Sequence, residues 1–371
     1  MSLKKTPLHS LHLAHQAKMV DYAGWEMPIE YAGILAEHKQ VRTAAGIFDV
    51  SHMGESIISG PQAEAMVQLL VTSDVAALQD GQIAYTVMCT EDGGIVDDLL
   101  VYKFSPHKFL LVVNAANTQK DLEWIKQHQL PDCEITDASE EFAVIAIQGP
   151  KAEDILQPLC PSDLSGIKLF RFIPDSEVAG KSALISRTGY TGENGFEIYL
   201  APADAPHVWE ALLNQGGSDI APAGLGARDT LRFDAKLPLY GQELGPDISP
   251  LEAGLAWCVH LDKPEFIGQA ALREQAATGP KRKQVEFELL GRGIPRSGYP
   301  VHKDGKEIGY VTSGYHAPSL DKAIGLALIA SEYAQPGETI DIVVRKRTIP
   351  ARIGRGLFYV PAYRRRKKTK K

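Results

Sequence analysis

The sequence predicts an α+β protein whose sheets are mainly antiparallel. Strand-like runs outnumber the segments that could serve as crossover helices, which argues against a doubly wound parallel fold. Residues 182–187 and 196–200 are strand-like and are joined by a glycine-studded loop, which is typical of a hairpin. From Lys283 onward, short strand-like runs alternate with Gly and Pro turns, which predicts a terminal β-barrel or sandwich of about 90 residues. The 371 residues are enough for two or three domains.

The composition is that of an ordinary soluble globular protein, with 44% hydrophobic and 23% charged residues. No run approaches the roughly 20 apolar residues of a membrane span, and the N-terminus lacks the apolar core of a signal peptide. The four cysteines follow no CxxC or zinc spacing, and a disulfide framework is implausible in so large a chain. We therefore expect a cytoplasmic protein that has no membrane partner.

Charge is spread unevenly along the chain. The formal net charge is −7, but seven of the last eight residues are Lys or Arg, so the rest carries 32 basic against 46 acidic residues. An acidic body argues against a nucleic-acid partner. We expect the basic tail, residues 364–371, to be solvated, with a contact to an acidic partner or RNA as the less favoured interpretation.

The N-terminal third holds patterns that tempt a catalytic or metal assignment. His9, His12 and His15 recur every three residues, but no carboxylate or cysteine joins them, so a metal site is the less favoured interpretation. Residues 19–31 are aromatic-rich and broken by Gly and Pro, which predicts an irregular segment. Residues 34–45 predict a helix that ends at Gly46.

A short Asp–Ser–His cluster follows, at Asp49, Ser51 and His52. A catalytic triad is defined by geometry, and neighbours on one strand or turn cannot adopt it, so we do not assign serine catalysis here. Two later segments resemble one another, because a strand-like run leads through Gly60-Pro61 into one helix and through Gly149-Pro150 into another. This repeat suggests two related α+β domains.

The most informative stretch is the apolar strand at residues 95–102, which follows a turn at Gly93-Gly94. Side chains alternate between the faces of a strand, so Asp97 and Asp98 must point in opposite directions. A carboxylate among aliphatic neighbours has to be paired, hydrogen-bonded or neutralised. An edge strand whose two acids simply meet water is the alternative.

A second candidate group is formed by Glu197 and Arg228. Residues 196–200 alternate, so that Glu197 shares a face with Tyr199 while their neighbours face the other way. Arg228 follows a Gly-rich stretch at the start of a predicted helix, where a fixed guanidinium suits a carboxylate or a pterin-like acceptor.

Eight motifs occur in an order that resembles the T-protein family of the glycine cleavage system: MVDYAGWEMP, FDVSHMGE, GGIVDDLLVY, VVNAAN, SRTGYTGENGFE, GLGARDTLR, YGQE and TSGYHAPSL. The resemblance spans residues 6–359. It implies a three-domain cloverleaf around a central folate channel. The boundaries we expect are residues 1–48 with 140–245 for the folate-binding domain, 49–139 for a second domain, 246–275 for a linker region and 276–371 for a C-terminal β domain with the basic tail.

The resemblance also implies a reaction, in which the methylene of the aminomethyl group on the lipoyl arm of H-protein is transferred to tetrahydrofolate and ammonia is released. Tetrahydrofolate would be the acceptor co-substrate, without a metal or a flavin, and the lipoyl-bearing H-protein would be the protein partner. Asp98 matches the family's catalytic aspartate, Glu197 would accept hydrogen bonds from the pterin, and Arg228 would contact the folate; Asp97 would be structural. Six further positions match residues that surround the folate in the family: Met53, Tyr85, Leu100, Asn114, Tyr190 and Trp257. For each of these alone, core packing would be the simpler explanation.

Three alternative functions are less well supported by the sequence. A folate-binding protein of the same fold, of the iron–sulfur-assembly type, would carry a cysteine where residues 236–242 have none. A sarcosine or dimethylglycine demethylase module would need FAD, and the chain has no dinucleotide fingerprint. A purely structural module does not explain the convergence of Gly, Tyr and acidic positions on one family pattern. Tyr363 and Arg364 could approach the site, but we leave them out of it.

Overall fold

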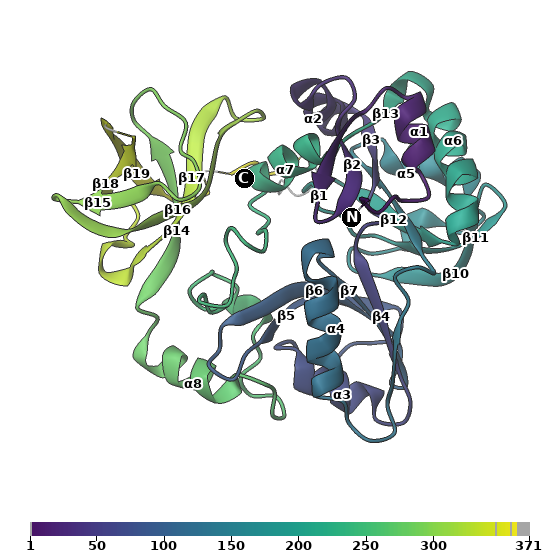
Figure 1. The fold of residues 1–371 in the computed structure, drawn as a ribbon, viewed down its shortest axis with the longest axis horizontal. Coiled ribbons are helices and arrows are strands. Elements are labelled where there is room, and N and C mark those ends of the chain that lie inside the picture. Colours follow the sequence, from purple (N-terminus) through teal and green to yellow (C-terminus); the bar gives the residue numbers. More distant parts are fainter. Residues whose placement is uncertain (1, 346, 357, 362–371) are drawn as a thin grey trace, which may run out of the picture.

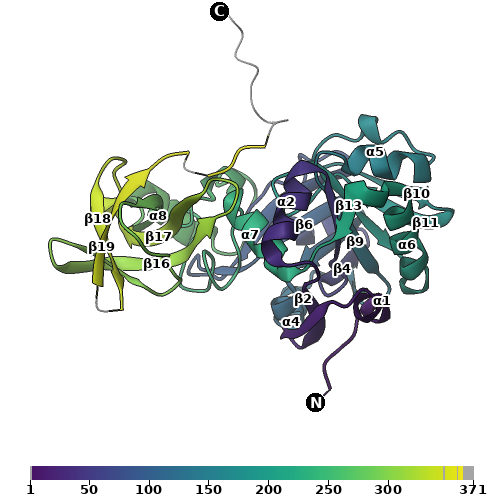
Figure 2. The same ribbon diagram turned by 90° about the horizontal axis from the view of Figure 1, so that it is seen from above.

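The computed structural model describes residues 2–345, 347–356 and 358–361. Figure 1 shows three lobes around a common centre: a six-stranded sheet with helices, a five-stranded sheet with helices, and a closed barrel. This confirms the predicted α+β class with mainly antiparallel sheets and a C-terminal barrel. In the view of Figure 2 the barrel lies at one end, and helix α7 (Leu225–Asp234) lies between it and the sheets.

The six-stranded sheet is antiparallel except at one edge, where β13 runs parallel to β3. Its order is β10 (Phe172–Val178), β11 (Lys181–Ser186), β12 (Gly195–Leu200), β9 (Ala143–Gln148), β3 (Ala45–Asp49) and β13 (Ile220–Pro222). One face packs against α5 (Ala152–Leu156), α6 (Ala205–Gly216) and the start of the chain near α1 (His9–Ala14). Along β12, Phe196 and Ile198 point to one face of the sheet, and Glu197 and Tyr199 point to the other. This alternation follows from the two-residue period of a strand.

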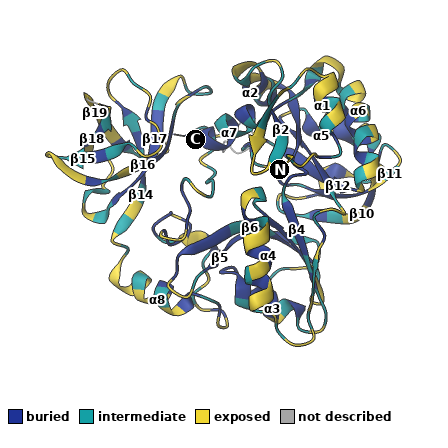
Figure 3. Cartoon of the chain, in the orientation of Figure 1, coloured by how far each residue is buried: buried dark blue, intermediate teal, exposed yellow. Residues whose placement is uncertain are grey.

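The five-stranded sheet is antiparallel throughout. Its order is β5 (Gln82–Cys89), β6 (Ile95–Ser105), β7 (Lys108–Val113), β4 (Gly54–Ser59) and β8 (Glu134–Asp137). Helices α3 (Ala63–Leu70) and α4 (Thr118–Gln127) cover the outer face, and their solvent sides are exposed in Figure 3. The inner face, with Tyr102 and Val112, packs against the inner face of the first sheet in one shared core.

The C-terminal lobe is a closed barrel, because β14 pairs with both β17 and β19. Its strands are β14 (Arg282–Leu289), β15 (Pro300–Lys303), β16 (Lys306–Ala317), β17 (Lys322–Ala330), β18 (Thr339–Val344) and β19 (Arg347–Gly354). Closure removes the exposed strand edges that invite aggregation. Helix α8 (Gln269–Thr278) precedes the barrel, and among the described residues no helix is long and apolar enough to cross a membrane.

Two local predictions are wrong. Residues 19–31 form a hairpin, β1 (Lys18–Tyr22) and β2 (Trp25–Glu30), turned at Ala23-Gly24 with positive φ at both residues. Helix α2 ends earlier than predicted (Ile34–Thr43), and Gly46 lies in β3, where a Cβ would collide with the Val41 side chain; the glycine permits close packing rather than capping the helix. Trp257 lies in a 3-10 turn.

The segment between the sheets and the barrel is anchored by a buried lysine. The Lys263 ammonium donates to the carbonyl oxygens of Gln68, Val71 and Ser73 at 2.6–2.7 Å. Nearby, residues 244–255 pack against β5 and β6.

The domain boundaries given above stay a prediction, and the basic tail, with Tyr363, lies outside the described residues.

The turn before β6 makes a close backbone contact that holds residues 244–255 in place. The Ile95 amide lies within hydrogen-bonding distance of the carbonyl oxygens of Gly245 (3.2 Å) and Ile248 (3.1 Å). Beside it, a Cβ on Gly94 would collide with the Pro246 carbonyl oxygen, so only glycine fits.

We therefore expect Gly94→Ala to lower the free energy of unfolding by about 2 kcal/mol or more, because backbone atoms must shift to accept the methyl group. Gly245→Ala is the matched control, since a Cβ there meets nothing within 4 Å; it should change stability by no more than about 0.5 kcal/mol. Urea denaturation measures both. Equal effects of the two substitutions would contradict the close contact.

Candidate active site

One cavity of about 540 Å³ lies where the two sheets meet the segment that leads to the barrel. This is the size of a small-molecule site. Residues from both sheets, from α7 and from residues 236–257 line it. Every site residue selected from the sequence is among them: Met53, Tyr85, Asp98, Leu100, Asn114, Tyr190, Glu197, Arg228 and Trp257.

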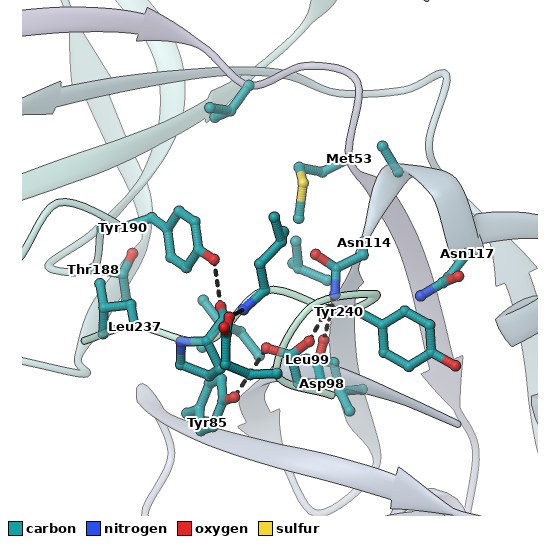
Figure 4. A pocket seen from close by; sticks show the side chains of 18 of the residues that line it. Met53, Tyr85, Asp98, Leu99, Asn114, Asn117, Thr188, Tyr190, Leu237 and Tyr240 are labelled. Carbon is teal, nitrogen blue, oxygen red and sulfur yellow. Dashed lines mark hydrogen bonds between the residues drawn. The ribbon is translucent and has the colours of Figure 1, made fainter. Parts of the chain in front are cut away.

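Asp98 stands on β6 at the wall of this cavity, as Figure 4 shows. The Tyr85 hydroxyl donates to its Oδ2 at 2.9 Å, and the Asn114 side-chain amide donates to its Oδ1 at 2.9 Å. Burial and then the charge of Asp97 raise the pKa of Asp98 to about 7, although the two hydrogen bonds act in the other direction. The carboxyl group can therefore exchange a proton near neutral pH.

Asp97 lies behind the sheet, fully buried on the opposite face of β6. It accepts hydrogen bonds from the backbone amide of Asn114 (3.1 Å), from the Asn114 side chain (2.8 Å) and from the Asn117 side chain (2.7 Å). Strand β6 lies between β5 and β7, so the alternative of an edge strand whose acids meet water is wrong. The Asn114 amide thus joins two carboxylates that the strand directs apart.

A second carboxylate, Glu197 on β12, borders the cavity. The Thr188 hydroxyl donates to its Oε2. Burial raises the pKa of Glu197, while the Thr188 hydrogen bond and the positive charge of Arg228 act against this rise. The Arg228 guanidinium lies 4.6 Å from the centre of the Tyr190 ring. Among the described residues, no carboxylate lies within ion-pair distance of Arg228, so its charge is available to a ligand.

Aromatic and apolar side chains form the rest of the wall. Trp257 is 64% exposed and stacks on Tyr85, with the ring centres 5.6 Å apart. The Tyr190 hydroxyl donates to the Pro238 carbonyl oxygen and so ties the loop after β11 to residues 236–240. Met53 and Leu100 add apolar surface. An exposed indole beside an enclosed apolar wall is suited to the planar rings of a ligand.

The structure adds cavity residues that sequence reasoning did not select. His52 lines the cavity, where burial and the charge of Arg228 lower its pKa to about 4, so the ring is neutral at physiological pH. Glu55 also lines it, and its carboxyl oxygens have no hydrogen-bond partner among the described residues; burial raises its pKa well above the usual range. Both residues lie close to Met53 in the motif FDVSHMGE. This proximity was the signal in the sequence that could have identified them.

His9 and His12 near the N-terminus, and Asp49 of the Asp–Ser–His cluster, form structural hydrogen bonds. His12 is buried and bonds Asp49 (2.8 Å) and the Tyr31 hydroxyl (2.9 Å), while His9 bonds Glu26. Asp49 also accepts the Ser51 backbone amide at 3.0 Å, so it orients this turn. Within the described ranges, no three His, Cys, Asp or Glu side chains are grouped so that they could hold a metal ion.

The raised pKa of Asp98 predicts a pH-dependent stability difference. Because the folded-state pKa of about 7 exceeds the ordinary value of 3.8, the folded chain binds more protons between these pH values, and stability falls as pH rises through 7. Asp98→Asn cannot ionise. Its free energy of unfolding relative to wild type should therefore rise by about 1 kcal/mol or more between about pH 5 and about pH 8. A difference that does not change with pH, measured by urea denaturation, would argue against a raised pKa.

Comparisons with known proteins agree along most of the chain. Residues 8–263 match the GCVT N-terminal domain, and residues 282–359 match the glycine cleavage T-protein C-terminal barrel domain. An aminomethyltransferase of Desulfitobacterium hafniense (strain Y51) is 56% identical over 360 residues, which is 96% of this chain and 98% of that protein. One of Bacillus subtilis (strain 168) is 49% identical over 359 residues, with 96% and 99% covered. The crystal structure of glycine cleavage system aminomethyltransferase T from Bartonella henselae matches with a TM-score of 0.90 at 32% identity, covering 97% of this chain and 99% of that one. The resemblance found in the motifs is thus confirmed, and the chain belongs to the glycine cleavage T-protein family.

Proposed function

We propose that this chain is the aminomethyltransferase of a glycine cleavage system. It takes the aminomethyl group carried on the lipoyl arm of H-protein and transfers the methylene carbon to tetrahydrofolate. The products are 5,10-methylenetetrahydrofolate, ammonia and dihydrolipoyl H-protein. Family membership supports the reaction class, and one observation carries the assignment of the site: a carboxyl group with a pKa near 7, Asp98, borders a ligand-sized cavity that a second carboxylate, Glu197, also borders.

The chemistry of the wall fits a reduced folate. A pterin presents adjacent N–H donors along one edge, and a fixed carboxylate accepts two of them side by side; Glu197 fills this role, with Thr188 holding one of its oxygens. Arg228 supplies the positive charge that a folate carboxylate or the pterin carbonyl attracts. Tyr190, Met53, Leu100 and Trp257 provide the apolar surface for the rings.

The role of Asp98 follows from the bonds that change. The methylene carbon gains bonds to two folate nitrogens and loses its bonds to the lipoyl sulfur and to the departing ammonia. Each folate nitrogen sheds one proton, and the two leaving groups take up one proton each. A carboxyl group with a pKa near 7 is suited to receive and return such a proton, and a positioned side chain of this kind contributes roughly 10²–10⁴-fold to a rate. Asn114 and Tyr85 hold the carboxyl group in place.

The cavity wall also bears on the alternative of an iron–sulfur-assembly protein. Residues 237–240 line the cavity without a thiol, and none of the four cysteines is among its lining residues. A reactive cysteine is the feature that would favour this alternative. The aminomethyltransferase function needs no thiol from this chain, since the sulfur belongs to the lipoyl arm.

The proposed function is tested by incubating the full chain with aminomethyl-loaded H-protein, with and without tetrahydrofolate. We expect ammonia and 5,10-methylenetetrahydrofolate to form in equal amounts, and both to depend on tetrahydrofolate. Failure to form methylenetetrahydrofolate while tetrahydrofolate still binds would instead favour a folate-binding protein without transferase activity.

In the same assay, Asp98→Asn should lower transfer at least about 100-fold, because the amide cannot accept the proton at this position. Tetrahydrofolate affinity, measured by calorimetry, should change far less. Equal losses of affinity and turnover would make Asp98 a binding group only.

Glu197→Gln should act mainly on binding. The amide preserves the shape of the side chain and leaves an acceptor for Thr188, but it removes the charge that strengthens the hydrogen bonds from the pterin. We expect the affinity for tetrahydrofolate to fall at least about tenfold, which corresponds to about 1.4 kcal/mol. Glu141→Gln, at an exposed position, is the control. An unchanged affinity of the Glu197→Gln variant would remove Glu197 from the pterin site.

A further inference from the structure

One buried acid in the cavity wall has no role in the function proposed above. Glu55, on β4, is 1% exposed and lines the cavity, yet neither of its carboxyl oxygens has a hydrogen-bond partner among the described residues. His52, in the turn before β4, also lines the cavity, and its buried Nδ1 likewise has no partner in that part of the chain. Buried polar groups in folded proteins are nearly always paired. This wall therefore offers hydrogen-bonding atoms to a ligand.

The backbone around Glu55 fixes the direction of its side chain. Strand β4 is paired on both sides, with β7 and β8, and the Glu55 backbone amide donates to the Ser139 Oγ at 3.0 Å. Glu55 lies two residues before Ile57, which packs in the core that the two sheets share. A strand has a period of two, so both side chains point to this inner face. The carboxyl group is therefore held on the cavity side of the sheet.

Glu55 and Asp98 face different parts of the cavity. Glu55 lies opposite Val112 on β7, and Val112 lies opposite Leu100 on β6. Two strand spacings of about 4.8 Å place the Glu55 backbone roughly 10 Å from β6. Asp98 lies two residues further along β6. A ligand that fills the cavity therefore meets the two acids with different groups.

The surroundings of Glu55 favour the neutral acid. An ionised carboxylate without a donor or a cation is strongly unfavourable inside a protein. The charges that act on Glu55 are those of Asp137 on β8 and Glu197 on β12, and both are negative. Burial and then these two charges raise the pKa of Glu55 well above its usual range. A neutral carboxyl group offers a donor, its O–H, beside an acceptor, its carbonyl oxygen.

A reduced pterin has an edge that matches this pair. Its 2-amino group lies between two ring nitrogens, of which one carries a hydrogen and the other is an acceptor. In the proposed function, the carboxylate of Glu197 takes the edge with two N–H donors. We propose that Glu55, as a neutral carboxyl group, binds the adjacent edge of the pterin: it donates its O–H to the acceptor nitrogen and accepts the second N–H of the 2-amino group. The inference rests on tetrahydrofolate being the ligand, as in the proposed function.

Two substitutions at Glu55 separate this pairing from bulk and from charge. Glu55→Gln keeps a donor beside an acceptor, whereas Glu55→Met keeps the length of the side chain and loses both. In calorimetry with the full chain, we expect Glu55→Met to weaken tetrahydrofolate binding at least about tenfold, and Glu55→Gln to stay within about threefold of wild type. The same change to Gln at Glu197 should weaken binding, because the ligand needs a charge there. Glu134→Met, exposed on the neighbouring strand β8, is the control.

Two binding results would overturn the proposal. Unchanged affinity in Glu55→Met would mean that Glu55 meets only water. A loss in Glu55→Gln as large as that in Glu55→Met would mean that the ligand needs a carboxylate at this position. Urea denaturation without ligand gives a second readout, because removal of an unpaired buried acid should leave the unfolding midpoint of Glu55→Met equal to or above that of wild type. A lower midpoint would indicate a structural role and would also overturn the proposal.

The same experiments distinguish this inference from the proposed function. If wild type binds tetrahydrofolate with this pattern of variants but forms no methylenetetrahydrofolate, the proposed function fails and the role of Glu55 stands. If wild type forms the product and Glu55→Met binds tetrahydrofolate normally, only the role of Glu55 fails. Absence of tetrahydrofolate binding to wild type would overturn both.

Discussion

The side-chain amide of Asn114 is the contact on which the site depends. It donates to Asp97 on one side of β6 and to Asp98 on the other. A strand directs consecutive side chains to opposite faces, so no direct contact can align these two acids. Asn114 can reach both because it follows β7, the neighbour of β6, at the point where the chain turns towards α4. Asn114 therefore links the proposed catalytic carboxyl group of Asp98, on the cavity side of the sheet, to Asp97 on the opposite face.

The same strand period explains why the cavity has carboxylates from both sheets. Asp98 on β6 and Glu197 on β12 each occupy the inner face of their sheet, and the shared core of Tyr102, Tyr199 and Val112 holds these faces together. The segment that leads to the barrel contributes residues 236–257, which the Tyr190 hydroxyl ties to the loop after β11, and the barrel itself contributes Gln284 and Leu326. A site assembled from three lobes depends on all of these contacts.

Short-range patterns could be predicted from the sequence, and long-range contacts could not. The alternation along β6 and β12, the hairpin around the glycine-rich loop and the β-rich C-terminal lobe all follow from residue periodicity and turn chemistry. The family resemblance selected nine residues that do line one cavity. The β1–β2 hairpin was missed because its turn sits at Ala23-Gly24, within a run broken by Gly and Pro.

The most direct test of this account is the ionisation of Asp98 itself. Aspartate labelled with carbon-13 at the side-chain carboxyl, with Asp98→Asn used to assign the signal, allows a carbon-13 NMR titration of the intact chain. We expect a midpoint near 7, well above the ordinary value of 3.8. A midpoint near 4 would mean that Asp98 is an ordinary solvated carboxylate, and it would contradict the central claim that burial and the neighbouring Asp97 prepare this group for proton transfer.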